Sequence, residues 1–243
     1  MTTPTDFMFR GAVALALILT FGLSLAQPVR ALRGDTFVVT TTNDENDSSC
    51  SDGDCSLRDA IEVAASGDTI EFAPDVTGVI TLTGSLATLV INKDLTINGP
   101  GASVLAISGN NNSRVFTVSS GVTTELSGLT IRDGDATNGS GGLDNDGTLT
   151  VKDSTFSGNV SRFGGGIANS GTLTVINCTF SDNSANYGGG MYNSGTVTVT
   201  NSTFSGNSAS TDGGGVYNDG TLHLRNTIIA NSTGGDCVAT LAT

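Results

Sequence analysis

A block between Gly141 and Ser232 repeats with an almost constant period, and this period restricts the possible folds more than any other feature of the chain. Three copies begin with a run of three glycines, at 164–166, 188–190 and 213–215, and a fourth, less regular copy begins at Gly141. An asparagine that follows each start recurs at positions 145, 169, 193 and 218, in steps of 24, 24 and 25 residues. A fixed period of this size is typical of stacked supersecondary units.

Short strands account for most residues of each copy. In Thr172–Val175 polar and apolar residues alternate, which is the period of a strand, and no stretch of the repeat shows the 3.6-residue period of a helix. We expect about three strands in each copy, near Ile167, Leu173–Val175 and Thr179–Phe180. The next coil then stacks about 4.8 Å away in parallel register. The sequence therefore predicts an all-β fold, a right-handed parallel β-helix with coils of about 24 residues.

Equivalent positions of the copies predict columns of side chains along the solenoid. Four columns are expected to point inward: Leu143, Ile167, Met191 and Val216; Leu149, Leu173, Val197 and Leu222; Val151, Val175, Val199 and Leu224; and Phe156, Phe180, Phe204 and Ile229. Two further columns are asparagines, whose amides can bond to one another along the axis and to turn backbone that water cannot reach. These predicted structural ladders are Asn145, Asn169, Asn193 and Asn218, and Asn159, Asn183 and Asn207.

Residues 1–31 have the pattern of a secretory signal peptide. Arg10 precedes an apolar run from Gly11 to Ala26, and the small residues of a cleavage site are expected at Ser24–Ala26 or at Val29–Ala31. The run is short for a membrane span, so we expect cleavage, no span after signal removal, and secretion or display at the cell surface; a retained N-terminal anchor is the alternative. The rest divides into an N-terminal cap, 32–67, and the β-helix, 68–243, with no linker between them.

The cap is predicted to hold a strand over Thr36–Thr41 and a short amphipathic helix. Ser56 with Asp59 three residues later is a capping-box start. Three apolar residues share one face of the expected helix: Leu57, Ile61 and Ala64. We therefore expect about ten residues, 56–65, to form a helix that covers the N-terminal end of the solenoid. Cys50 and Cys55 bracket a tight turn, and in an exported chain this spacing favours a local disulfide.

Two motifs resemble known families. Cys55–Ile61 reads Cys-Ser-Leu-Arg-Asp-Ala-Ile and resembles the CSLREA signature that opens many secreted bacterial β-helix proteins, with Asp59 where that motif usually has Glu. The closing Asn226–Asn231 is also typical of that group. The Phe-x-x-Asn and triglycine-aliphatic repeats resemble those of the polymorphic outer membrane protein family. The usual form there is Gly-Gly-Ala-Ile, and this chain has Gly166 at the position of the alanine. The resemblance covers roughly 35–237 and implies the fold, but it does not fix an activity.

Two regions outside the regular repeats carry further expectations. Between cap and repeats, the expected strand runs are Asp68–Phe72, Val79–Leu82, Leu89–Ile91, Leu95–Ile97, Val104–Ile107, Val115–Val118 and Leu126–Ile131. At the other end, no cap is recognisable after Ile229, so we expect a truncated β-helix or a partner that covers the last coil. Cys237 should lie about two coils, roughly 10 Å, from Cys178, too far for a disulfide, so both thiols are expected to be free.

Candidate residues for chemistry are few. Polysaccharide lyases and hydrolases share the predicted fold and keep acids with an arginine on an outer strand face, and Arg132, Asp133 and Asp135 are the residues that could form such a calcium-dependent site. No resident cofactor is expected. Calcium is the alternative, because hard oxygen ligands in flexible loops suit that ion. The calcium candidates crowd one loop: Asp44, Glu45, Asp47, Asp52 and Asp54.

The charge and the outward residues indicate a binding protein. A net charge of −13 repels nucleic acid and anionic lipid. The outward repeat positions recur as Thr, Ser and Asn rather than as an acid–base pair, so we expect a secreted or cell-surface, non-catalytic scaffold with adhesin-like binding of glycans or other surfaces. The alternative is a pectate-lyase-like, polysaccharide-degrading enzyme. Paired outward threonines on successive coils, such as Thr172 and Thr174, leave ice binding as a third possibility.

Overall fold

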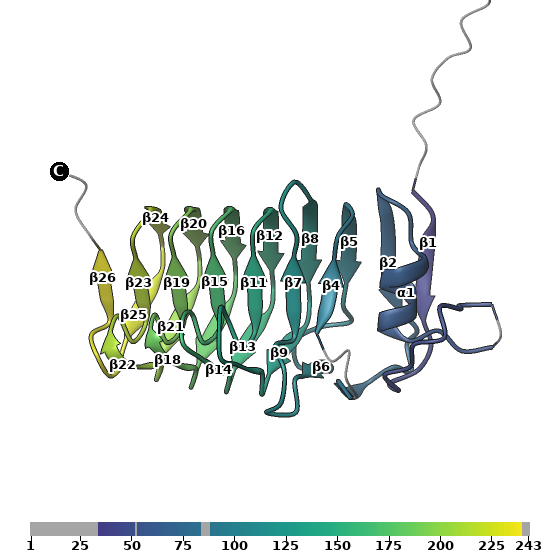
Figure 1. Ribbon diagram of the computed structural model, residues 1–243, viewed down its shortest axis with the longest axis horizontal. Coiled ribbons are helices and arrows are strands. Elements are labelled where there is room, and N and C mark those ends of the chain that lie inside the picture. Colours follow the sequence, from purple (N-terminus) through teal and green to yellow (C-terminus); the bar gives the residue numbers. More distant parts are fainter. Residues whose placement is uncertain (1–33, 52, 84–87, 240–243) are drawn as a thin grey trace, which may run out of the picture. The chain divides into compact units, whose positions relative to one another are not determined.

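The computed structural model describes residues 34–51, 53–83 and 88–239, all of which belong to the unit Arg33–Thr243. The predicted signal peptide, 1–31, lies outside these residues. The described chain winds as a parallel β-solenoid, in which successive strands lie in different sheets and each pairs with the strand one coil away (Figure 1). The predicted all-β, parallel fold is confirmed.

Four sheets collect the strands of the described residues. Sheet A contains β1 (Thr36–Val39), β2 (Asp68–Phe72), β5 (Leu95–Asn98), β8 (Thr123–Ser127), β12 (Thr148–Lys152), β16 (Thr172–Ile176), β20 (Thr196–Thr200) and β24 (Thr221–Arg225). Sheet B contains β3 (Gly78–Thr81), β6 (Leu105–Ser108), β9 (Thr130–Arg132), β13 (Thr155–Ser157), β17 (Thr179–Ser181), β21 (Thr203–Ser205) and β25 (Ile228–Ala230). Sheet C contains β4 (Leu89–Ile91), β7 (Phe116–Val118), β11 (Leu143–Asn145), β15 (Ile167–Asn169), β19 (Met191–Asn193), β23 (Val216–Asn218) and β26 (Cys237–Ala239). Sheet D contains β10 (Asp135–Ala136), β14 (Val160–Ser161), β18 (Ser184–Tyr187) and β22 (Ser208–Asp212).

The core follows from the alternation of apolar and polar residues on these strands. In β16 the side chains of Leu173 and Val175 are buried while Thr172 is exposed. The register pairs Leu149 with Leu173 and Leu173 with Val197, so equivalent residues stack into the predicted columns. The rings of Phe156, Phe180 and Phe204 stack with centroids 4.9 and 4.2 Å apart. Burial of each such ring contributes about 1.5–3 kcal/mol to stability.

Two rows of buried asparagine side chains run beside the apolar core. In the first row, Nδ2 donates to Oδ1 of the next asparagine at 2.7 Å in each step: Asn145 to Asn169, Asn169 to Asn193, and Asn193 to Asn218. In the second row the same contact measures 2.9 Å: Asn159 to Asn183, and Asn183 to Asn207. These amides also donate to backbone carbonyls, as Asn169 Nδ2 does to Gly171 O at 3.2 Å. The rows thereby satisfy polar backbone groups that would otherwise be buried unpaired.

Sheet D differs from the sequence prediction, which allowed about three strands in each coil. Its strands are short and bury small side chains such as Ala185 and Ala209, while Val160 is 43% exposed. Without an apolar alternation, these strands give no periodic signal. The single strand expected over Leu126–Ile131 is also wrong. Gly128, at φ +64°, turns the chain there from β8 in sheet A to β9 in sheet B.

The N-terminal cap contains α1 (Leu57–Val63), a helix of seven residues rather than the expected ten. Ala64 leaves the helical conformation, with ψ 145°, and ends it early. The helix contacts β1 and β4, the edge strands of sheets A and C, and its apolar residues join the core. Its terminal carbonyls, of Glu62 and Ala64, accept hydrogen bonds from Lys93 Nζ at 2.8 Å. The helix thus covers apolar residues at the N-terminal edge of the core.

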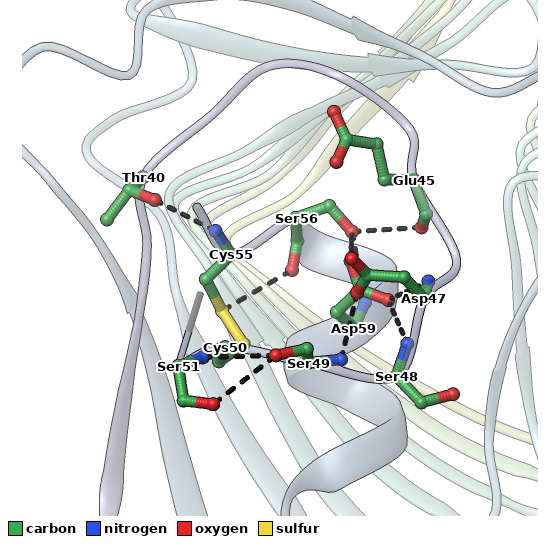
Figure 2. The surroundings of a disulfide bond; sticks show 10 residues. All are labelled: Thr40, Glu45, Asp47, Ser48, Ser49, Cys50, Ser51, Cys55, Ser56 and Asp59. Carbon is green, nitrogen blue, oxygen red and sulfur yellow. Dashed lines mark hydrogen bonds between the residues drawn. A yellow bond between two sulfur atoms is a disulfide. The ribbon is translucent and has the colours of Figure 1, made fainter. Parts of the chain in front are cut away.

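A buried carboxylate ties the preceding loop to this helix (Figure 2). Ser56 Oγ accepts from the Asp59 amide at 3.1 Å, which is the N-cap contact that the sequence predicts. Asp59 Oδ1 accepts from the backbone amides of Asp47 and Ser48 at 3.1 and 3.0 Å. The disulfide between Cys50 and Cys55 closes the same loop (Figure 2).

The last described coil is less covered than the coils before it. Leu224 is 43% exposed, whereas Val199, one coil earlier in the same column, is fully buried. β26 pairs with β23 and places Cys237 opposite Val216, which explains the position of this cysteine as a continuation of an aliphatic column. Cys178 is buried and Cys237 exposed, and both are free thiols. Within the described part of the chain, no helix has the length and apolarity needed to cross a membrane.

Candidate functional site

The residues of the predicted lyase site lie where sheet B meets sheet D. Arg132 ends β9, Asp133 sits in the turn at φ 52°, and Asp135 begins β10 with its side chain exposed. Asp133 Oδ2 lies 3.2 Å from Arg132 Nε and accepts from Ser108 Oγ at 3.1 Å. Although this distance is short, Arg132 Nε is buried and makes no hydrogen bond. The ion pair is therefore poorly aligned. The carboxylate of Asp133 is therefore engaged by its own turn and the neighbouring coil.

The acids of the predicted calcium loop have different surroundings. The carboxylate side chain of Asp44 is 2% exposed, forms a bidentate pair with Arg58 at 2.8 and 3.0 Å, and also accepts from the Thr83 backbone amide. Glu45 accepts from the Asn43 side chain, Asp47 accepts from the Ser49 amide, and Asp54 is exposed; Asp52 lies outside the described residues. In residues 34–51, 53–83 and 88–239, no three His, Cys, Asp or Glu side chains are grouped to hold a metal ion.

The outer face of sheet C and its corner with sheet D carry a cluster of aromatic rings, which we call the tyrosine patch and define as Phe163, Tyr187, Tyr192 and Tyr217. Tyr192 and Tyr217 stack with centroids 5.4 Å apart, and Phe163 stacks on Tyr187 at 5.9 Å. The two rows touch, since the centroids of Phe163 and Tyr192 are 5.1 Å apart and those of Tyr187 and Tyr217 are 5.4 Å apart. All three tyrosines of the chain are in this patch, and the chain has no tryptophan.

The repeat explains why these rings gather. Tyr192 and Tyr217 follow the inward residues of β19 and β23, so the pleat points them outward. Phe163 and Tyr187 precede the glycine runs and form a bridge at the corner that leads to sheet C. Gly188, at φ +67°, permits the sharp turn that follows Tyr187. The two rows therefore meet across this corner on successive coils.

A hollow of about 230 Å³ opens at one end of the tyrosine patch. Register places Asp144, Ala168 and Tyr192 at successive positions of the same outward row of sheet C. Ala168 has the smallest side chain of the three and, at 6% exposure, forms the floor of the hollow. Phe163 and Tyr192 line the hollow together with polar residues: Asp144, Asp146, Asn169, Ser170 and Ser194.

The polar wall of the hollow is held by the half-buried side chain of Arg114. Arg114 Nη1 lies 3.2 Å from Asp144 Oδ2, and its other contacts are to Ser140 O, Thr117 Oγ1 and Asn138 O. Burial raises the pKa of Asp144 and the nearby Asp146 raises it further, while Arg114 lowers it. Burial also raises the pKa of Tyr192, so its hydroxyl remains protonated at neutral pH. The wall thus combines hydroxyl groups with carboxylate acceptors.

The tyrosine patch was not predicted from the sequence. Its signal is the spacing itself: Tyr187 follows Phe163 by 24 residues, and Tyr217 follows Tyr192 by 25. By contrast, the threonines of sheet A point outward as predicted, with Thr172 exposed and Thr174 half-buried. Their row is interrupted by Glu125, which pairs with Lys152 at 2.8 Å, and by His223. The tyrosine patch is therefore the more distinctive of the two faces.

Comparison with known proteins agrees with the architecture. The model of a family described as the right-handed beta helix region matches residues 79–234, well over half of the chain. Neither a curated protein nor a solved structure shows significant similarity to it. The matched region includes the tyrosine patch, both asparagine rows and the phenylalanine stack. The chain therefore belongs to the right-handed β-helix family.

Proposed function

We propose that this protein is a non-catalytic β-helix scaffold, secreted or displayed at the cell surface, that binds glycans or other surfaces through the outer face of sheet C. The observation that carries the proposal is the tyrosine patch. Tyrosine supplies a large and rigid contact area with a polar hydroxyl, and it is enriched where proteins recognise partners. The solenoid holds the four rings on a rigid frame, so little conformational entropy is lost when a ligand binds.

The expected signal peptide, the disulfide and the family resemblance support the same proposal. A signal peptide over 1–31 would export the chain, and the Cys50–Cys55 disulfide suits an oxidising compartment. Cys55–Ile61 resembles the CSLREA signature and the repeats resemble those of polymorphic outer membrane proteins, two groups found outside the cytoplasm. A calcium ion at the acidic loop, and a partner or further segment on the last coil, belong to the same proposal as additions.

Binding to immobilised glycans and to cell surfaces tests the proposal. The variant Tyr192→Ala/Tyr217→Ala removes two stacked rings, and we expect a loss of affinity of about tenfold or more, as for other aromatic anchors. Thr174→Ala/Thr198→Ala, on the outer face of sheet A, is the matched control and should bind like the wild type. Equal binding by both double variants would place the contact elsewhere.

The lyase alternative is separated in the same preparation. Polygalacturonate and alginate are incubated with the protein, with and without calcium, and the absorbance of the unsaturated product is followed. A scaffold leaves both polymers intact. Calcium-dependent growth of that absorbance, lost in Arg132→Ala, would instead assign an enzymatic site to Arg132, Asp133 and Asp135.

A further inference from the structure

The hollow beside Ala168 has an aromatic wall and a polar wall. Phe163 and Tyr192 meet at an interplanar angle of 57°, so a flat ring that stacks on Tyr192 meets Phe163 at its border and not face to face. The other wall carries Asp144, Asp146 and Ser170, with a hydrogen bond between Ser170 Oγ and Asp146 Oδ1. At about 230 Å³ the hollow is smaller than a pocket for a drug-sized ligand. It has room for a single ring with one apolar face and a polar rim.

The charges around the hollow restrict that ring further. Two carboxylates lie on its wall, and the guanidinium of Arg114 directs its donors to Asp144, Thr117 and two backbone carbonyls. A second guanidinium, that of Arg162, is engaged over the Phe163 ring at 4.9 Å from the ring centroid. The hollow therefore offers hydrogen-bond acceptors to hydroxyl groups, and such bonds to carboxylates are among the stronger ones. An anionic ligand would meet two negative charges in a protein whose net charge is −13.

We propose that the Ala168 hollow binds one uncharged sugar ring of a glycan, stacked on Tyr192 beside Phe163 with its hydroxyls donated to Asp146 and Asp144, and that it rejects uronic acids. The C–H face of a pyranose carries partial positive charge and suits the negative face of an aromatic ring. This inference rests on the proposed glycan-binding function and adds the ligand class to it.

The test fills the hollow without removing any of its walls. Ala168→Phe places a ring at the floor of the hollow, in an outward row that already holds Tyr192 and Tyr217, and strands favour aromatic residues. Thr174→Phe makes the same kind of change on sheet A and is the matched control. Calorimetric titration with neutral hexose oligosaccharides should show at least tenfold weaker binding for Ala168→Phe and an unchanged affinity for Thr174→Phe. Thermal unfolding of both variants checks that they are folded.

Charge selectivity is the second readout. The wild type should bind neutral oligosaccharides more tightly than oligogalacturonate of equal length, and Asp146→Asn should narrow that difference. If Ala168→Phe binds like the wild type, or if the uronate binds as tightly as the neutral sugar, the ligand assignment is wrong. The scaffold proposal still stands in that case provided that Tyr192→Ala/Tyr217→Ala loses binding. If the double tyrosine variant also binds normally, or the wild type binds no glycan or cell surface, both proposals fall.

Discussion

Replacement of Asn169 by alanine tests the account of how the coils are held together. The Asn169 side chain is 1% exposed and has four hydrogen-bond contacts, in which the two N–H groups of Nδ2 are shared among three acceptors. Its Nδ2 donates to Asn193 Oδ1 at 2.7 Å, to Gly171 O at 3.2 Å and to Thr196 O at 3.3 Å, and its Oδ1 accepts from Asn145 Nδ2 at 2.7 Å. Asn169→Ala removes all four and leaves their partners in a space that water does not reach.

The size of the stability loss depends on which hydrogen bonds the partners of Asn169 retain in the variant. Asn145 Nδ2 retains Gly147 O and Thr172 O at 3.3 and 3.2 Å, so its loss is partial. Asn193 Oδ1 loses the amide that donates to it, and a buried polar group left without its partner costs about 1–3 kcal/mol. We therefore expect Asn169→Ala to lower the free energy of unfolding by about 1–3 kcal/mol.

Urea denaturation measures this loss as a shift of the midpoint at constant slope. Thr174→Ala, at an outward position of the same coil, is the control and should change stability by no more than about 0.5 kcal/mol. Asn183→Ala, in the second row, should cost at least as much as Asn169→Ala because Asn183 Oδ1 also accepts from the Asn159 backbone amide at 3.1 Å. If the urea midpoint of Asn169→Ala equals that of Thr174→Ala, the asparagine row does not stabilise the coils as proposed.

Three further predictions address packing, backbone space and thiol chemistry. Phe180→Ala removes the middle ring of the stack and should cost about 3–5 kcal/mol in denaturant unfolding; a cost like that of a surface residue contradicts the packing. Gly190→Ala would place its Cβ 2.6 Å from Gly215 O and 2.8 Å from the Phe204 ring, so its melting temperature should fall well below that of the wild type. Burial raises the pKa of the Cys178 thiol to about 11, so the stability that depends on the protonated thiol is complete below 9.0 and is lost as pH rises through about 11. At pH 8 an alkylating reagent should therefore modify the exposed Cys237 and reach Cys178 only after unfolding, and mass mapping that finds Cys178 modified in the native protein contradicts this.

The regular coils were predictable because the period aligns equivalent residues. Once Phe156 and Phe180 occupy the same repeat position, parallel stacking brings their rings together, and the same reasoning applies to Asn145 and Asn169. Alternation along Thr172–Val175 then determines which side chains enter the core. In such a fold, sequence equivalence and spatial proximity are almost the same property.

The corners were less predictable because turn geometry depends on single residues and not on a pattern. Asp153 and Asn177 occupy equivalent turns between sheets A and B on successive coils, with φ values of 48° and 55°. The side-chain Nδ2 of Asn177 donates to Asp153 Oδ1 at 3.1 Å. Asn and Asp tolerate this conformation better than other non-glycine residues. The strands of sheet D, such as Val160–Ser161, were missed because they lack an apolar alternation.

The candidate site required the structure. The period places Phe163 with Tyr187, and Tyr192 with Tyr217, but only the angle of the corner between sheets D and C brings the two pairs into contact. The hollow depends on one small residue, Ala168. Strand alternation predicts that its side chain points outward, but the sequence does not predict that a hollow forms there. Asp144 pairs with Arg114 from the preceding coil, and no sequence pattern connects these two residues.

Tyrosine fluorescence during a glycan titration is the most direct test of whether glycans bind at the tyrosine patch. The chain has three tyrosines and no tryptophan, and all three lie in the tyrosine patch, so intrinsic tyrosine emission reports on this face alone. Binding at the outer face of sheet C predicts a saturable change in emission with the same midpoint as the calorimetric titration, and a weaker midpoint in Ala168→Phe. A glycan that binds by calorimetry while the emission stays constant would contradict the account.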